Sequence, residues 1–246
     1  FANPFIKYTY FKKRKDVIKL LPKLNKNAIL LDAGCSIGTF EETLNDIAFP
    51  LYKIIGVDFA PEAIKIARSK TVPNTDFLCK SINNLPFENN LFDCIVMIAV
   101  IEHLSNKRKA LNELKRTLKE KGQIIITTPN KKNIILKIHN FLLEIASRII
   151  SKKEVDKDEY LSRKELTQLL KEDFVIKKSI IRYFIPLSFT VHKRTIGLFP
   201  LLPPSLNLKL TKFSTNDENI KVPSILREYF AWTIFVVAEK KAKIND

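Results

Sequence analysis

The sequence predicts an α/β protein in which helices cover both faces of a mostly parallel sheet. Apolar runs that suit buried strands alternate along the chain with segments of helical periodicity. The first clear strand leads directly into a loop with glycines at positions 34 and 38, where the backbone can turn sharply. With 246 residues, 46% of them hydrophobic, the chain can bury one large core without disulfides.

The strands and helices follow in order. We expect parallel strands at residues 28–34, 53–58, 75–80, 92–99 and 122–128, and two final strands at 174–181 and 232–238. A helix should begin near Thr39, and another at Pro61, since proline suits a first helical turn. A stripe of apolar side chains predicts a further helix, and it consists of Ala110, Leu111, Leu114 and Leu118. A capping box formed by Ser162 and Glu165 predicts the start of another helix.

The loop after the first strand is the candidate ligand site. Asp32 stands where the strand joins the loop, so it would repel a pyrophosphate and attract a ligand that carries an ammonium and a sulfonium. Asp58 ends the next strand, about 20 residues further on, where a carboxylate can accept hydrogen bonds from both ribose hydroxyls. Gly34 and Asp58 alone would also suit a dinucleotide enzyme. NAD is the weaker alternative, because Thr39 replaces the third glycine of the dinucleotide fingerprint.

Five motifs in order resemble the class I S-adenosylmethionine-dependent methyltransferases, in their small-molecule branch. They are Asp32 to Gly38 with Asp58, Asn84 to Phe87, Leu91 to Asp93, Ile101 to Leu104 and Thr127 to Asn130. The resemblance implies a Rossmann-like sheet of seven strands, whose last two strands form an antiparallel pair. It also implies S-adenosyl-L-methionine as the cofactor.

The resemblance assigns the cofactor-binding residues one by one: Asp32, Gly34, Cys35, Ser36, Gly38, Asp58, Phe59, Ser81 and Ile82. Two of them depart from the family. Ser36 stands where a second glycine is usual, and Ser81 replaces the aspartate that usually holds the adenine amino group. A serine hydroxyl still accepts a hydrogen bond, more weakly than a carboxylate. Phe59 and Phe87 also suit ordinary core or rim positions.

His103 is the candidate catalytic residue. It would take the proton from an acceptor hydroxyl, whereas a carboxylate acceptor would need no base. A hydrogen-bonded structural role for His103 is the alternative.

The composition indicates a cytoplasmic enzyme. Three cysteines, at positions 35, 79 and 94, are an odd number without metal-ligand spacing. We therefore expect neither a disulfide framework nor a metal site, and we expect the cysteines to be small core residues. No apolar stretch approaches the ~20 residues of a membrane span. The chain begins at Phe1, so a preceding segment is conceivable.

The charge is distributed unevenly. Residues 27–130 have no net charge, whereas residues 1–26 carry +7, residues 131–153 carry +5 and residues 177–212 carry +7. We therefore expect a basic N-terminal helical segment over 1–26 and one methyltransferase domain over 27–246. In that domain, 27–130 is the cofactor half, and 131–160 and 183–228 are acceptor insertions that form an apolar, basic cap. An amphipathic helix over 133–151 and an irregular segment over 183–206 would build this cap.

A basic, apolar cap suits a small or lipid-linked anionic acceptor, methylated at oxygen, and contact with a membrane surface. Two alternatives stay open. An RNA-directed methyltransferase would also explain the charge. The replacements at Ser36 and Ser81 would be compatible with a non-catalytic module that binds the cofactor.

Overall fold

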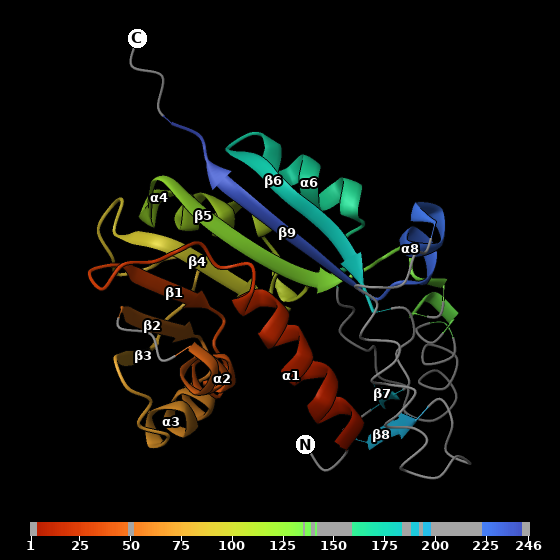
Figure 1. The fold of residues 1–246 in the computed structure, drawn as a ribbon, viewed down its shortest axis with the longest axis horizontal. Coiled ribbons are helices and arrows are strands. Elements are labelled where there is room, and N and C mark those ends of the chain that lie inside the picture. Colours follow the sequence, from red (N-terminus) through yellow and green to blue (C-terminus); the bar gives the residue numbers. More distant parts are fainter. Residues whose placement is uncertain are drawn as a thin grey trace.

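A seven-stranded sheet forms the centre of the computed structural model (Figure 1). The structure describes residues 4–48, 52–134, 136–138, 141, 159–183, 188–191, 194–197 and 223–242. In spatial order the strands are β3 (Thr75–Cys79), β2 (Lys53–Asp58), β1 (Ile29–Ala33), β4 (Phe92–Ile98), β5 (Leu118–Pro129), β9 (Thr233–Lys240) and β6 (Phe174–Arg182). The first five strands are parallel, and β9 runs antiparallel to both of its neighbours. The predicted seven-stranded, mostly parallel sheet is therefore confirmed.

Helices cover both faces of the sheet. On one face, α4 (Lys107–Thr117) and α6 (Arg163–Lys171) pack leucine side chains such as Leu114 and Leu166 against the strands. On the other face lie α1 (Pro4–Ile18) and α2 (Thr39–Ala48), which contribute Val17 and Leu44 to a second core layer. The helix α3 (Pro61–Ser69) packs against β3 near the sheet edge.

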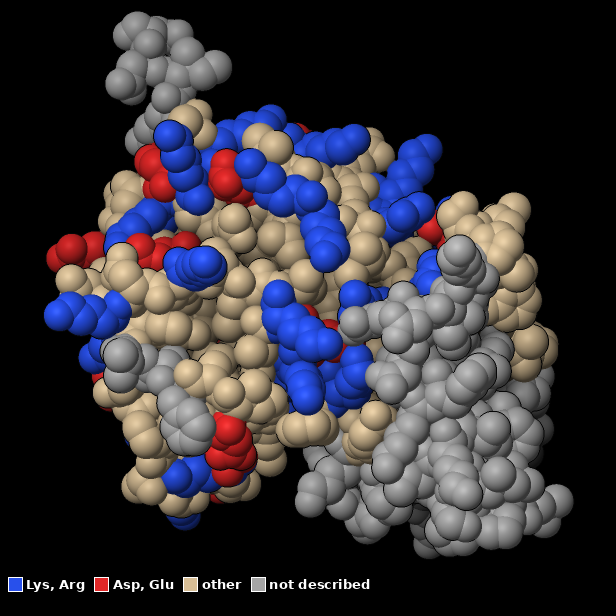
Figure 2. All heavy atoms as spheres, viewed as in Figure 1, with Lys and Arg blue, Asp and Glu red and all other residues tan. Residues whose placement is uncertain are grey.

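The basic N-terminal segment forms α1, which is fixed to the sheet through one buried carboxylate. Asp16 is 1% exposed and pairs with Lys12 of the same helix at 2.7 Å. The hydroxyl of Tyr183, just beyond β6, donates to Asp16 Oδ2 at 2.6 Å, and Arg182 lies 3.2 Å from the same oxygen. Figure 2 shows lysine and arginine side chains gathered over α1. The contacts of Asp16 hold α1 beside the carboxyl ends of the parallel strands (Figure 1).

Local signals for the elements are confirmed. The helix α2 begins at Thr39, α3 has Pro61 in its first turn, and Ser162 and Glu165 form both hydrogen bonds of a capping box. The strand β5 is longer than predicted, because its pairing with β4 already begins at Leu118. Among the residues that the structure describes, no helix is long and apolar enough to cross a membrane.

The structure differs from the prediction at two places within residues 183–230. Residues 183–206 were expected to be irregular, but β7 (Ser188–Val191) and β8 (Arg194–Gly197) pair as an antiparallel hairpin. Backbone hydrogen bonds between two short segments form this hairpin, and its apolar run has no clear period-two pattern that would predict it. The short helix α8 (Ser224–Phe230) was not predicted either. Most of the amphipathic helix expected over 133–151 lies outside the described residues.

The sheet order places a ligand site. From β1 the chain proceeds through β2 to β3 in one direction, whereas β4 and β5 lie on the other side of β1. Ligands of open α/β sheets bind beyond the carboxyl ends of the strands at such a reversal. The predicted glycine loop follows β1 directly, and Asp58 ends β2. The fold therefore brings both to the reversal point.

Candidate cofactor site

The glycine loop after β1 turns in a conformation that other residues rarely adopt. Gly34 has a φ of +94°, and a Cβ built on it would lie 2.3 Å from Val100 Cγ2. Gly38 has a φ of +71°, and its Cβ would lie 2.8 Å from the Phe77 ring. The loop is also held to β2, because the Gly34 N–H donates to Val57 O at 2.7 Å. Both glycines are therefore required by space as well as by backbone angle.

Asp58 joins the loop to the end of β2. Its Oδ2 accepts from the Ser36 backbone N–H at 2.9 Å, and its Oδ1 accepts from the Ala60 N–H at the same distance. Each carboxylate oxygen keeps a further lone pair for a ligand hydroxyl. Ser36 has a φ of +50°, a left-handed conformation that costs a non-glycine residue roughly 1 kcal/mol. The serine at this position thus keeps the glycine-type turn.

A pair of buried carboxyl groups lies behind the loop. Asp32 is 2% exposed, Glu41 of α2 is fully buried, and Asp32 Oδ1 and both Glu41 oxygens have no hydrogen-bond partner among the described groups. Burial, together with the neighbouring Glu41 and Asp58, raises the pKa of Asp32 well above its usual range. Burial also raises the pKa of Glu41 to about 7. One proton shared by the two groups leaves a single negative charge behind the loop.

Glu41 is the residue of this site that sequence reasoning missed. Glu41 lies in the first turn of α2, where an acidic residue also makes an ordinary favourable contact with the helix dipole. Its neighbours Phe40 and Leu44 are both buried, so Glu41 occupies the inward face of an amphipathic helix. An acidic residue on such a face is the signal that could have identified it. Gly56 of β2 makes room for it, since a Cβ there would lie 2.8 Å from Glu41 Oε1.

We expect Glu41→Gln to stabilise the protein at pH 8, by about 1–3 kcal/mol. The folded-state pKa of Glu41 is raised from 4.5 to about 7, so between these values the folded state binds more protons than the unfolded state. Stability must therefore fall as pH rises through this window. The glutamine side chain is uncharged at every pH, so the variant does not bear the cost of burying an ionised carboxylate. Urea unfolding at pH 5 and pH 8 measures the difference, which should nearly vanish at pH 5.

The matched control for this experiment is Glu62→Gln, which changes an exposed glutamate in the first turn of α3. Its stability should follow the wild type at both pH values. An equal gain in the control variant, or a Glu41→Gln variant less stable at pH 8 than the wild type, would contradict the buried-pair interpretation.

The remaining predicted cofactor residues surround Asp58. Phe59 is 80% exposed, which excludes a core position and leaves its ring on the surface, next to Asp58 in sequence. Ser81 follows β3 and is exposed, with its Oγ accepting from the Asn83 N–H at 3.3 Å. Ile82 is buried at 7% exposure, and Cys35 is buried within the loop.

Phe87 and the three cysteines differ in how far they agree with the prediction of core or rim positions. Phe87 is a core-rim aromatic as expected, since it packs edge-on against Phe92 with 5.0 Å between ring centroids. Cys35 and Cys94 are buried, but Cys79 is exposed, so the expectation that all three cysteines are core residues is wrong for Cys79. Cys79 is the last residue of β3, at the carboxyl end of the edge strand of the sheet. All three thiols are free.

His103 lies beyond β4, in the short 3-10 helix η1 (Ile101–His103), and is exposed. Its neighbour Glu102 is 3% exposed and accepts from the Thr128 hydroxyl at 3.0 Å. Burial raises the pKa of Glu102, while the charge of Lys13 from α1 partly offsets the effect. Lys13 is itself 6% exposed, and burial lowers its pKa. The end of β4 and α1 therefore together form a polar wall beside the glycine loop.

These groups fit a nucleoside cofactor with a positively charged end. The loop backbone and the Asp58 carboxylate form a cradle for a ribose, and the exposed Phe59 ring lies next to it in sequence. The buried Asp32–Glu41 pair supplies one negative charge on the inner side of the loop. Fold and site together define an α/β domain for a nucleoside cofactor.

Comparisons with known proteins agree with a domain that binds a nucleoside cofactor. Residues 31–126 match a family model described as a methyltransferase domain. A demethylmenaquinone methyltransferase of Thermotoga maritima is 32% identical over 136 residues, which are 54% of this chain and 58% of that protein. A tRNA (carboxymethyluridine(34)-5-O)-methyltransferase of Arabidopsis thaliana is 34% identical over 127 residues, which are 50% of this chain and 30% of that protein.

Solved structures show the same fold. A Haloferax volcanii methyltransferase, determined in complex with the Trm112 methyltransferase activator, superposes with a TM-score of 0.65 at 15% identity. The match covers 96% of this chain and 91% of that one. Residues 31–126 thus match a methyltransferase domain, and the fold is that of solved S-adenosylmethionine-dependent methyltransferases, in agreement with the motifs. The cofactor of this class is S-adenosylmethionine.

Proposed function

We propose that this protein transfers a methyl group from S-adenosylmethionine to oxygen of a small or lipid-linked anionic acceptor. The observation that carries the proposal is the Asp58 carboxylate, which holds the glycine loop through Ser36 and keeps lone pairs that can accept from the hydroxyls of a ligand. The sulfonium supplies an activated methyl group, so the protein's task is to position the acceptor oxygen in line with it.

The residues of the cofactor site have separate roles in this proposal. Asp58 accepts hydrogen bonds from the ribose hydroxyls, and Phe59 stacks on the adenine, whose edge lies at Ser81 and Ile82. The backbone of Gly34, Cys35, Ser36 and Gly38 holds the methionine portion. The carboxyl pair Asp32–Glu41 favours the positively charged end of the cofactor, because its single negative charge is buried.

His103 is the proposed base. It is exposed beside the end of β4, on the same edge of the sheet as the glycine loop. From there its imidazole can take the proton of an acceptor hydroxyl while the oxygen attacks the methyl carbon. Lys13 and Glu102 lie behind it, and they fix the polarity of the wall against which the acceptor binds.

Charge supports an anionic acceptor. The net charge of residues 27–130 is zero, so the basic excess of the chain lies in residues 1–26, 131–153 and 177–212. Near an anionic surface each clustered lysine or arginine contributes on the order of 1 kcal/mol, and salt weakens that attraction. We propose a cytoplasmic protein that works at a membrane surface. The relative named for demethylmenaquinone supports a lipid acceptor, and the relative named for tRNA supports the RNA alternative.

Labelled methyl transfer tests the proposal. The protein is incubated with methyl-labelled S-adenosylmethionine and a cell extract, and the product is separated into lipid, small-molecule and RNA fractions. We expect label in the lipid or small-molecule fraction. Label mainly in RNA would favour the RNA-directed alternative, and cofactor binding without any transfer would favour a non-catalytic module.

A further inference from the structure

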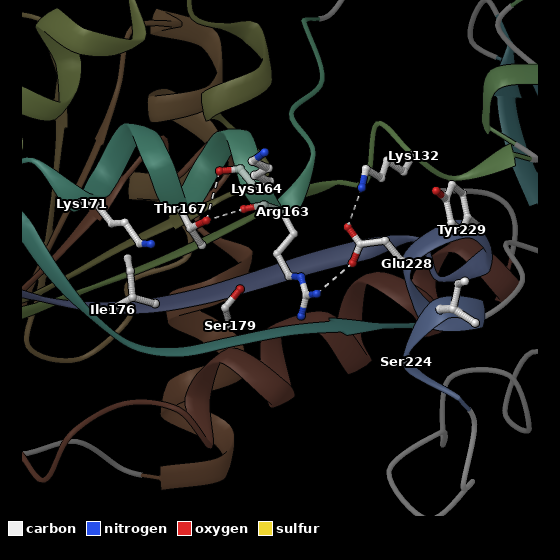
Figure 3. Close-up of a pocket in the computed structure, with 11 residues that line it drawn as sticks. Lys132, Arg163, Lys164, Thr167, Lys171, Ile176, Ser179, Ser224, Glu228 and Tyr229 are labelled. Carbon is white, nitrogen blue, oxygen red and sulfur yellow. Dashed lines mark hydrogen bonds and ion pairs between the residues drawn. The ribbon is translucent and has the colours of Figure 1, made fainter.

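An open groove lies between α6, β6 and α8, on the side of the sheet remote from β3 (Figure 3). Its volume is about 630 Å³. Among the described residues, four cationic side chains line it, and Glu228 is the only acidic one. The cations are Lys132, Arg163, Lys164 and Lys171.

Two of the cations are held in place by Glu228. Lys132 Nζ lies 3.3 Å from one oxygen of this carboxylate, and Arg163 lies 3.0 Å from the other. Figure 3 shows both side chains directed toward Glu228 at the α8 end of the groove. One negative charge against two positive ones leaves this end of the groove cationic.

The other two cations have no acidic partner within the described part of the chain. Lys164 and Lys171 lie seven residues apart on α6, with Thr167 between them on the same face. The glutamates on either side are engaged elsewhere, Glu165 with Lys131 and Glu172 with Arg108. The acidic groups of α6 therefore do not neutralise its groove face.

The floor of the groove offers a polar atom and apolar contacts. Ser179 Oγ of β6 is buried and has no hydrogen-bond partner among the described residues. Ile225 of α8 is 65% exposed, and the Lys132 ammonium lies 5.8 Å from the centre of the Tyr229 ring. A ligand that fits this lining has a multiply charged anionic group joined to an apolar part.

Short links connect the groove to the cofactor side of the sheet. The Glu159 N–H donates to Glu102 O at 2.9 Å, and the Lys131 N–H donates to Leu161 O at 3.1 Å. Arg163, which lines the groove, follows Leu161 by only two residues. Asn130, at the end of β5, donates to two carbonyls at the end of α8. One end of the groove thus lies beside the edge that carries His103.

We propose that this groove binds the phosphate or diphosphate group of an amphipathic ligand, with Lys164 and Lys171 as its main contacts. In this proposal the ligand is the methyl acceptor, and its anionic end occupies the groove. The groove proposal therefore rests on the proposed function. A phosphate group provides several acceptor oxygens for ammonium groups and for the Ser179 hydroxyl. Free phosphate esters and phospholipid headgroups share this chemistry.

The test compares two variants with the same change in charge. Lys164→Gln/Lys171→Gln removes the unpaired groove cations, and Lys65→Gln/Lys109→Gln removes two exposed lysines of α3 and α4. Inorganic pyrophosphate is titrated calorimetrically into each protein. Vesicles of phosphatidylcholine with and without phosphatidic acid are co-sedimented across a salt series, with RNA as a competitor.

We expect the groove variant to bind the probe about 10- to 30-fold more weakly, and the control variant to follow the wild type. Pyrophosphate binding without vesicle binding would identify a soluble phosphate ester. Vesicle binding that pyrophosphate displaces would identify a headgroup. Equal losses in both variants, preference for RNA, or binding of neither probe would overturn the proposal. S-adenosylhomocysteine affinity is measured in parallel. If the wild-type protein does not bind S-adenosylhomocysteine, that result contradicts the proposed function and not the groove proposal.

Discussion

Asp58→Ala should weaken the binding of S-adenosylhomocysteine by roughly 1.5–3 kcal/mol, or about 10- to 150-fold. The substitution removes the carboxylate proposed to accept from the ribose hydroxyls. It also removes the acceptor for the Ser36 N–H, so the glycine loop loses the contact that orders it against β2. Both losses act on the same ligand, which places this effect among the largest expected. Calorimetric titration measures it.

Asp76→Ala is the matched control. Asp76 lies on the neighbouring strand β3, but its side chain is 60% exposed and pairs with Lys53 at the surface. Its loss should leave cofactor affinity nearly unchanged. Unchanged affinity in Asp58→Ala would refute the assignment of Asp58. NAD binding tighter than S-adenosylhomocysteine would refute the cofactor preference derived from Asp32.

His103→Ala should lower turnover about 100-fold or more, with an acceptor identified by labelled transfer, while cofactor affinity stays nearly intact. The reason is that the variant lacks the imidazole proposed to receive the proton of the acceptor hydroxyl. The wild-type rate should fall on acidification, because a protonated imidazole accepts no proton, and the variant should lose this dependence. Single-turnover rates across a pH series measure both effects.

The control for His103 is Ser105→Ala, which alters an exposed residue just beyond η1. It should retain the wild-type rate and pH profile. If His103→Ala has normal turnover, His103 is a structural residue or the acceptor is a carboxylate. In that outcome Asp58→Ala still tests the cofactor site independently.

Local information was sufficient for most of the framework. The strands were predicted because apolar runs and their flanking glycines and prolines are contiguous in sequence. The capping box at Ser162 and the helix start at Thr39 were predicted for the same reason, since each signal spans only a few residues. The glycine loop and Asp58 were recognised from their spacing alone, and the structure joins them by the Ser36 hydrogen bond.

Other features depend on contacts between segments that are remote in sequence. Asp32 and Glu41 become a coupled buried pair only because α2 packs its inner face against β1 and β2. Asp16 Oδ2 contacts both Tyr183 and Arg182 across more than half of the chain. Burial and charge coupling then set proton affinities that no local pattern contains.

The groove is the clearest case of a feature that only packing creates. Lys132 follows β5, Arg163 opens α6 and Glu228 belongs to α8, and ion pairs bring the three together. Composition indicated a basic excess over residues 131–153, which include Lys132, but the three cations of α6 lie outside the basic segments, and composition could not distinguish paired from unpaired cations. That distinction depends on which carboxylates lie nearby in space, and folding alone brings Glu165 and Glu172 to other partners.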